Sequence, residues 1–295
     1  MSVAVLDIET FASIETLGYL DYRYLKTRGR EELSDGELEK RLALNPYTLS
    51  VISAAVAHVE EGNIQEVAVY YIATDEEIYD EERPYPIRYV PILCPKLPQD
   101  LLEGERLLLE EFWQELEEAE SFVTYNGQNF DLPVLRLRSM IHGLPLPEKI
   151  ANPRLLRSST DHLDLADFLC ASNPEHRYTL EFVCRKFGID FTKNTMDGSK
   201  VHDAFLSGRY SDIARYNAQD AIATAQLYLR LIPYLPQELQ KPPTDRQLQY
   251  LNDLIATRAF GFSTSHVINW LATQGILTKN NVSRLIDELK RNEGL

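Results

Sequence analysis

Acidic side chains in three short motifs, spread over more than two hundred residues, constrain the fold of this chain more than any other feature. The first motif is the apolar run 3–10, in which Asp7 and Glu9 lie two residues apart. A strand here places both carboxylates on one face, because successive side chains alternate between faces. In the third motif Tyr216 and Asp220 lie four residues apart in a helical pattern, so they also share a face.

The second motif, Tyr-Asn-Gly-Gln-Asn-Phe-Asp at 125–131, contributes Asp131 ahead of an expected helix. If the fold brings the three motifs together, four carboxylates share one site, and their mutual repulsion requires cations. Carboxylate oxygens are hard ligands that suit Mg²⁺, and the site draws on no histidine or cysteine. The residue types therefore indicate a site for divalent metal ions.

Each of these residues also has an ordinary structural explanation when it is taken alone. Asp7 and Glu9 could end a strand that faces solvent, and Asp131 could cap a helix. Tyr216 and Asp220 could be core and surface residues of an amphipathic helix. These explanations would all have to hold at once, so the combination favours a shared site.

The order and spacing of the motifs resemble the DEDD 3′–5′ exonucleases of ribonuclease H-like fold. The corresponding segments are Asp-Ile-Glu-Thr at 7–10, Asn-Gly-x-x-Phe-Asp at 126–131 and Tyr-x-x-x-Asp at 216–220. The tyrosine subclass, related to the proofreading domains of family B DNA polymerases, fits better than its sister group. That group carries a histidine five residues before the last aspartate, where this chain has Arg215. The resemblance covers about residues 1–235.

The resemblance implies a two-metal site in which Asp7, Glu9, Asp131 and Asp220 hold two Mg²⁺ or Mn²⁺ ions. Two ions about 3.5–4 Å apart can clamp an in-line displacement at phosphorus. Tyr216 would hydrogen-bond the attacking water and orient it. A phenol with a pKa of about 10 is a poor base at neutral pH, so activation of the water is expected to come from the metal.

Four further residues are candidate substrate contacts. The resemblance implies that the chain runs next to the 3′-terminal nucleotide at Thr10 and Phe11. Phe130 could stack on a base, although a core position before the helix is an equal alternative. Asn126 could contact the substrate backbone or simply end its strand. His162 and Asp164 are interpreted as strand residues rather than ligands.

The chain is expected to divide at Gln240-Lys-Pro-Pro-Thr244. The part before the break alternates strands and helices, which predicts an α/β fold, a ribonuclease H-like mixed sheet flanked by helices. Strands are expected near 3–9, 49–58, 66–72, 87–93, 121–125 and 162–165, and helices within 18–45 and near 100–119, after 131, and near 179–187 and 212–232. Residues 241–295 are expected to form a small C-terminal helical module, or alternatively a helical cap on the domain formed by 1–240.

The net charge of −15 is unusual for a protein that binds nucleic acid. Residues 1–240 hold 23 basic and 40 acidic residues, giving −17, whereas residues 241–295 hold 7 and 5, giving +2. Substrate binding is therefore expected to be weak and salt-sensitive unless the tail or a partner contributes. A replication or repair protein bound through 241–295 would be such a partner.

Composition fits a cytoplasmic protein that does not enter a membrane. No run approaches the ~20 apolar residues that a membrane span needs, and the N-terminus opens into a strand rather than a signal peptide. The three cysteines, Cys94, Cys170 and Cys184, lie in no Cys-x-x-Cys pair and are expected to be buried apolar residues.

The function expected from these features is metal-dependent exonuclease activity. The enzyme would remove nucleotides from the 3′ end of single-stranded or frayed DNA and release nucleoside 5′-monophosphates. An exoribonuclease is a close alternative, because a phosphate-binding metal site does not itself distinguish the two sugars. A non-catalytic nucleic-acid-binding scaffold is a second alternative, although such a scaffold has no physical need for a strained acidic cluster.

Overall fold

The computed structural model describes residues 2–28, 32–75, 84–151, 162–170, 173–191, 196, 198–235, 248–251 and 253. The chain divides into two compact units, Met1–Leu231 and Ile232–Leu295. The helical module expected at 241–295 lies outside the described residues, apart from helical residues at 248–251 and 253. The first unit holds the six strands of the sheet.

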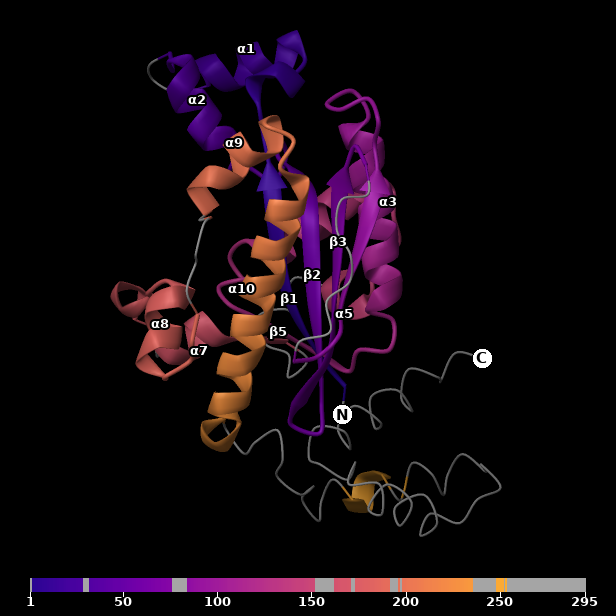
Figure 1. The fold of residues 1–295 in the computed structure, drawn as a ribbon, viewed down its shortest axis with the longest axis vertical. Helices are drawn as coiled ribbons and strands as arrows, with labels where there is room; N and C mark the ends of the chain where they lie inside the picture. The colour runs from indigo at the N-terminus through magenta and orange to yellow at the C-terminus, as the bar shows by residue number, and fades with distance from the viewer. Residues whose placement is uncertain are drawn as a thin grey trace. The chain divides into compact units, whose positions relative to one another are not determined.

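A mixed six-stranded sheet with the order β4-β3-β2-β1-β5-β6 forms the centre of this unit (Figure 1). The strands are β1 Val3–Phe11, β2 Ser50–Glu60, β3 Asn63–Ala73, β4 Ile87–Leu93, β5 Ser121–Thr124 and β6 His162–Asp164. β2 runs antiparallel to both of its neighbours, and the remaining pairs are parallel. β1 therefore lies inside the sheet, between the antiparallel and the parallel part.

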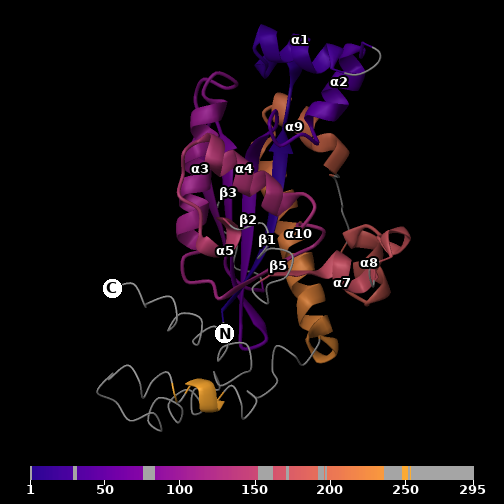
Figure 2. The same ribbon diagram turned by 180° about the vertical axis from the view of Figure 1, so that it is seen from behind.

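Helices cover both faces of the sheet, as Figures 1 and 2 show from opposite sides. The helices are α1 Tyr19–Thr27, α2 Asp35–Leu42, α3 Leu101–Glu115, α4 Asp131–Ile141, α5 Glu148–Ala151, α7 Leu165–Cys170, α8 Leu180–Lys186, α9 Val201–Leu206 and α10 Tyr210–Leu231. α10 packs along β1, β2 and β3 on one face, and α3 packs on β2 and β3 with α4 beside it. The expected α/β class, a ribonuclease H-like mixed sheet with flanking helices, is confirmed.

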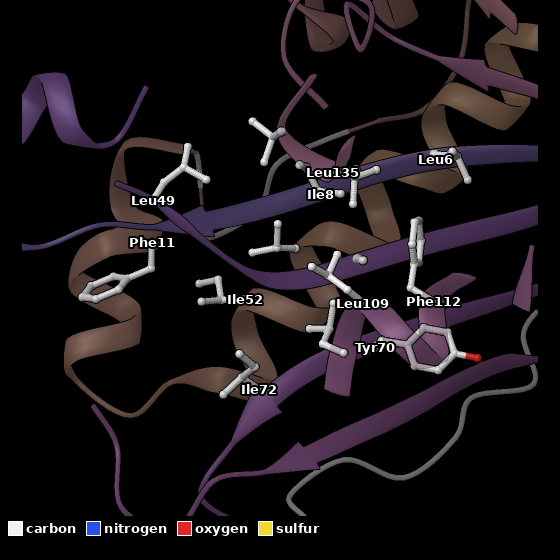
Figure 3. Packing of buried hydrophobic residues seen from close by; sticks show 14 of the residues in the cluster. Leu6, Ile8, Phe11, Leu49, Ile52, Tyr70, Ile72, Leu109, Phe112 and Leu135 are labelled. Atoms are coloured by element: carbon white, nitrogen blue, oxygen red, sulfur yellow. The ribbon is translucent and has the colours of Figure 1, made fainter. Parts of the chain in front are cut away.

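The core between the sheet and α3 is built from alternate side chains of β1, β2 and β3, those that point to the α3 face of the sheet. Figure 3 shows how the apolar side chains of these strands meet those of α3 and α4. The labelled residues include Leu6, Ile8, Ile52, Tyr70, Ile72, Leu109, Phe112 and Leu135, all buried. Because Leu6 and Ile8 point to this face, Asp7 and Glu9 point to the opposite face, toward α10.

Small residues allow α10 to lie close to the sheet. Ala214, Ala218, Ala221 and Ala225 follow one another at intervals of four, three and four residues, and all are fully buried. This spacing keeps them on one side of the helix, where methyl groups leave little distance between helix and strands. The polar residues of α10 are consequently brought to the same level as the carboxylates of β1.

A buried ion pair joins α3 to α4 behind the sheet. Glu105 is fully buried and accepts hydrogen bonds from Arg138 at 2.8 and 2.5 Å and from the backbone N–H of Val51 at 2.8 Å. The ring of His142 lies 2.9 Å from the same carboxylate. Burial alone would raise the pKa of Glu105, but the hydrogen bonds from His142 and Arg138 hold this pKa below its usual value.

Several expectations about local structure can be compared with the described residues. Within the helix-prone stretch, Ser34 and Glu37 form the expected capping box at the start of α2. Helix α3 ends at Glu115 rather than near 119. α7 and α9 were missed, because helices of six residues carry too little periodicity to stand out. Cys94, Cys170 and Cys184 are buried, as expected.

None of the helices within the described ranges combines the length and the apolar character that crossing a membrane requires.

The ion pair generates a prediction about stability. Arg138→Leu should lower the free energy of unfolding by about 3–5 kcal/mol at pH 7, because it leaves the Glu105 carboxylate buried without its cation. The cost should shrink near pH 4, where the lone carboxyl group can take up a proton. Arg106→Leu is the matched control, because Arg106 forms exposed ion pairs on α3 and should lose less than about 1 kcal/mol. Urea denaturation of both variants measures the difference, and equal losses would contradict the assignment.

Candidate active site

β1 extends past its neighbour β5, and this difference in length positions Asp131. The two strands pair only over Val3–Val5 of β1. Further along, the backbone N–H of Ile8 donates to Oδ1 of Asp131 at 3.2 Å. Asp131 is the first residue of α4, so its carboxylate takes the place of a strand partner and is fixed against the segment that carries Asp7 and Glu9.

Three carboxylates from two elements converge beside this point. Asp7 and Glu9 of β1 and Asp220 of α10 each bring one carboxylate oxygen within 4.8 Å of the other two. Asp220 is buried, and Asp7 and Glu9 are half-buried. Oxygen ligands at this spacing fit a hard divalent cation such as Mg²⁺ or Mn²⁺. Asp131 is not one of these three residues, but its pKa is influenced by the charge of Asp220.

The Asp131 carboxyl group is strongly perturbed. Burial raises its pKa to about 7, and the nearby charges of Asp164 and Asp220 act in the same direction. The backbone N–H of Ile8 opposes this shift only in part. A bound cation would favour the charged form, so the group is suited to a site that becomes fully ionised when metal is present.

Asn217 orients Asp7 from the neighbouring position on α10. Its side-chain amide N–H donates to Oδ2 of Asp7 at 2.7 Å, and its own Oδ1 accepts a hydrogen bond from the hydroxyl of Ser53 at 3.0 Å. Ser53 lies opposite Glu9 on β2, next to a bulge that places Ile52 as an extra residue. Asn217 and Ser53 are fully buried, so this chain of hydrogen bonds fixes one oxygen of Asp7.

The sequence-based reasoning passed over Asn217. Its position next to Tyr216 in the third motif could have indicated it, because a polar residue on the buried side of a helix needs a hydrogen-bond partner.

Tyr216 lies one turn before Asp220 on the same side of α10, as its spacing predicted. The side chain is 5% exposed. Burial raises the pKa of Tyr216 far above its usual value, and the charges of Asp220 and Glu9 raise it further. A hydrogen bond between the Tyr216 hydroxyl and Asp220 acts in the same direction, so the phenol stays protonated at neutral pH. A side-chain carbon at Gly198 would lie 4.0 Å from the phenol oxygen, so the turn before α9 borders this group.

Asp164 fixes the loop that leads to Asp131. Its carboxylate accepts the backbone N–H groups of Asn126 and Gln128, both at 2.9 Å. It also accepts those of Ala166 and Asp167 at the start of α7, at 3.0 and 3.2 Å. Asp164 is thus a helix cap that also holds a loop, in agreement with its interpretation as a structural residue. An aspartate directly before a short helical segment is the signal that predicts such a cap.

The side chain of Asn126 forms hydrogen bonds within and next to this loop. It has a left-handed backbone conformation with φ of 64°, and its Oδ1 accepts hydrogen bonds from Arg177 at 2.8 Å and from Asn129 at 3.0 Å. The alternative that Asn126 ends the strand agrees with these bonds.

The other three expected substrate contacts differ in their exposure. Phe11 is buried, and its ring packs on Phe205 with a centroid distance of 4.5 Å and on His202 at 5.1 Å. The ring of Phe11 thus belongs to the core, and a contact between Phe11 and substrate stays a prediction. Phe130 is half-buried and packs against the core, in line with its alternative interpretation. Thr10 is half-buried, directly after Glu9 on β1.

Comparison with known proteins identifies a family for this arrangement. Residues 94–274, well over half of the chain, match the family described as "predicted 3′–5′ exonuclease related to the exonuclease domain of PolB". The matched range contains Asp131, Tyr216 and Asp220 and begins after β1.

Two DNA polymerases are among the similar proteins. A DNA polymerase of Methanocaldococcus jannaschii is 24% identical over 204 residues, which cover 62% of this chain and 12% of the polymerase. The catalytic polypeptide of DNA polymerase epsilon from Emericella nidulans is 28% identical over 139 residues, which cover 44% of this chain and 6% of that polypeptide. The similarity thus concerns only a small part of each polymerase. Taken with the match over residues 94–274, it confirms the expected relationship: the chain belongs to the family of predicted 3′–5′ exonucleases related to the exonuclease domain of PolB.

Proposed function

We propose that this protein is a divalent-metal-dependent 3′–5′ exonuclease that removes single nucleotides from the 3′ end of DNA. The observation that carries the proposal is the convergence of Asp7, Glu9 and Asp220 within 4.8 Å, with Asp131 fixed against the same strand. Holding like charges together is costly, and a metal site is the physical reason to do so. This cluster also argues against a non-catalytic scaffold.

The carboxylates of Asp7, Glu9, Asp131 and Asp220 would hold two Mg²⁺ or Mn²⁺ ions. When bound, such ions lower the pKa of a coordinated water and stabilise charge on the phosphate and the leaving oxygen. Asn217 holds Oδ2 of Asp7 by a hydrogen bond of 2.7 Å, which restricts this ligand to one orientation. The resemblance to the tyrosine subclass of DEDD exonucleases supports this division of roles.

Tyr216 would donate its hydroxyl hydrogen to the attacking water and orient it toward phosphorus. Its raised pKa excludes a role as the base at neutral pH, because the phenolate is not populated. In the reaction, the water loses a proton to solvent and its oxygen forms a bond to phosphorus, as the bond from phosphorus to the 3′ oxygen breaks and this oxygen takes up a proton from solvent. The products are a nucleoside 5′-monophosphate and a shortened strand with a new 3′-hydroxyl group.

DNA is favoured over RNA because both of the similar proteins are DNA polymerases by name. The acidic site contacts phosphate and does not itself distinguish the sugars, so hydrolysis of RNA ends is the second candidate.

The proposal is tested with DNA and RNA oligonucleotides labelled at the 5′ end. Mg²⁺ or Mn²⁺ should start digestion that shortens the strands stepwise, EDTA should stop it, and a 3′-phosphate should block it. Asp7→Ala should lower the rate by about a hundredfold or more, since it removes a metal ligand, without altering the far-UV circular dichroism. Near-full activity of Asp7→Ala, or release of nucleotides from the 5′ end, would overturn the assignment.

Tyr216→Phe should be milder than loss of a metal ligand. The ring remains in the core, and only the hydrogen bonds of the hydroxyl group, with Asp220 and with the water, are lost, so kcat should fall about tenfold to a hundredfold. The melting temperature should change little. A loss of folding instead would show that the hydroxyl is needed for the structure rather than for the reaction.

Asp131→Asn should separate stability from activity. The pKa of Asp131 is about 7 in the folded protein and ordinarily 3.8. Between these two pH values the folded protein therefore binds a proton that the unfolded protein has released. The stability of the metal-free protein should therefore fall as pH rises from about 4 to about 7. The variant lacks this penalty, so in EDTA it should melt several degrees higher than wild type at pH 8 and similarly at pH 4.

Activity of Asp131→Asn should be lost at every pH. A melting temperature at pH 8 equal to or below that of wild type would show that the carboxylate is not destabilising in the folded protein.

A further inference from the structure

Three arginines stand out in a unit whose other cations mostly have partners. Lys26, Arg88, Arg106, Arg138 and Arg177 all form ion pairs. The guanidinium groups of Arg23, Arg28 and Arg41 are exposed and have no hydrogen bond or ion pair within the described part of the chain. All three belong to α1, its C-cap and α2, which connect β1 to β2. Residues 19–28 hold three basic residues and one acidic residue.

A groove between α1 and α2 is bordered by two of these arginines. It has a volume of about 310 Å³ and is lined by Leu25, Arg28, Leu38, Arg41, Leu42 and Asn45. Leu38 and Leu42 are buried and form an apolar floor, whereas Arg28 and Arg41 are exposed. The groove thus combines an apolar surface with two cations and an amide.

The outer face of α1 exposes aromatic and apolar side chains beside this groove. Tyr19, Leu20 and Tyr24 are 70%, 78% and 60% exposed. The helix is nevertheless seated firmly, because Tyr22 and Leu25 pack against the core from its inner side. An ordered helix that presents aromatic rings and exposed arginines together has the composition of a surface for single-stranded nucleic acid.

The two helices follow the strand that carries Asp7 and Glu9. Figures 1 and 2 both show α1 and α2 beyond the carboxyl end of β1, close to α9. Glu39 of α2 lies 3.8 Å from His202 of α9, and the His202 ring stacks on Phe11 at the end of β1. The same strand carries Glu9 two residues earlier, so the groove is connected through packed residues to the acidic cluster.

We propose that α1 and α2 form a binding surface for the part of the DNA strand that lies 5′ of the nucleotide being removed. Arg28 and Arg41 would contact backbone phosphates, the leucine floor would take a base or sugar, and Tyr24 would stack on a neighbouring base. This inference rests on the proposed function, because only a strand whose 3′ end lies among the carboxylates continues across this surface.

Charge complementarity identifies the occupant as a polynucleotide. Residues 1–240 carry a net charge of −17, so a polyanion would be repelled from most of the unit. Residues 19–45 are a local exception, because they hold six basic and six acidic residues. The exposed guanidinium groups of Arg23, Arg28 and Arg41 suit phosphate because a guanidinium group donates two parallel hydrogen bonds. A protein partner on this face is an alternative outcome of the test.

The test compares binding of a long oligothymidylate with hydrolysis of the p-nitrophenyl ester of thymidine 5′-monophosphate, which is too small to reach the groove. The double variant Arg28→Ala with Arg41→Ala should bind the oligonucleotide about tenfold more weakly in EDTA by fluorescence anisotropy. The slope of log affinity against log salt should become shallower by about 1.4, as two phosphate contacts are lost. Hydrolysis of the small ester in Mg²⁺ should be unchanged.

Three further variants sharpen the result. Lysine at both positions should restore most of the affinity and the salt slope, since the charge is retained. Tyr24→Ala should weaken binding severalfold without changing the salt slope, because it removes a stacking ring and no charge. Arg230→Ala is the matched control, an exposed arginine at the far end of α10, and should bind like wild type.

Unchanged affinity and salt slope in the double alanine variant would overturn the proposal and leave the face to a protein partner. An equal loss in Arg230→Ala would also overturn it, by showing a general effect of charge. Failure of the wild-type protein to hydrolyse either substrate would instead contradict the proposed function, and the binding measurements would remain a separate result.

Discussion

Repulsion between carboxylates is the constraint on which the rest of this structure depends. Asp7, Glu9 and Asp220 lie within 4.8 Å of one another, and Asp131 is buried beside them. Such a cluster is held only if each acid is attached to an element that is fixed by other contacts. β1 is fixed inside the sheet, α10 packs along three strands through its alanines, and α4 is tied to α3 by the buried Glu105–Arg138 pair.

Hydrogen bonds from buried neighbours decide the orientation of the acids. Asn217 and Ser53 hold Asp7 through a chain of two hydrogen bonds, and Asp164 holds the loop before Asp131 through backbone N–H groups. None of these groups faces open solvent, so their geometry varies little with side-chain rotation. The site therefore consists of acids whose positions are set before any ligand arrives, which reduces the ordering cost of binding.

The sequence predicted the strands and long helices well, because periodicity and cap residues are local signals. It also predicted that Asp7 and Glu9 share a face and that Tyr216 and Asp220 lie on one side of a helix. Asn217 and the double role of Asp164 were not foreseen, because their partners lie 210 and 38 residues away. The packing of Phe11 on Phe205 was not foreseen either, because Phe205 lies on a short helix with little periodicity of its own.

The greater length of β1 relative to β5 has a consequence for solubility. Where a strand is longer than its neighbour, its backbone N–H and C=O groups have no partner on that side. Such an edge can pair with a strand of another molecule. Here the N–H of Ile8 donates to the carboxyl group of Asp131, and two further acids, Asp7 and Glu9, flank Ile8 on the same strand. An incoming strand would have to displace a helix terminus and approach several like charges. The groups that form the proposed reaction centre thus also discourage self-association at the place where the sheet is least protected.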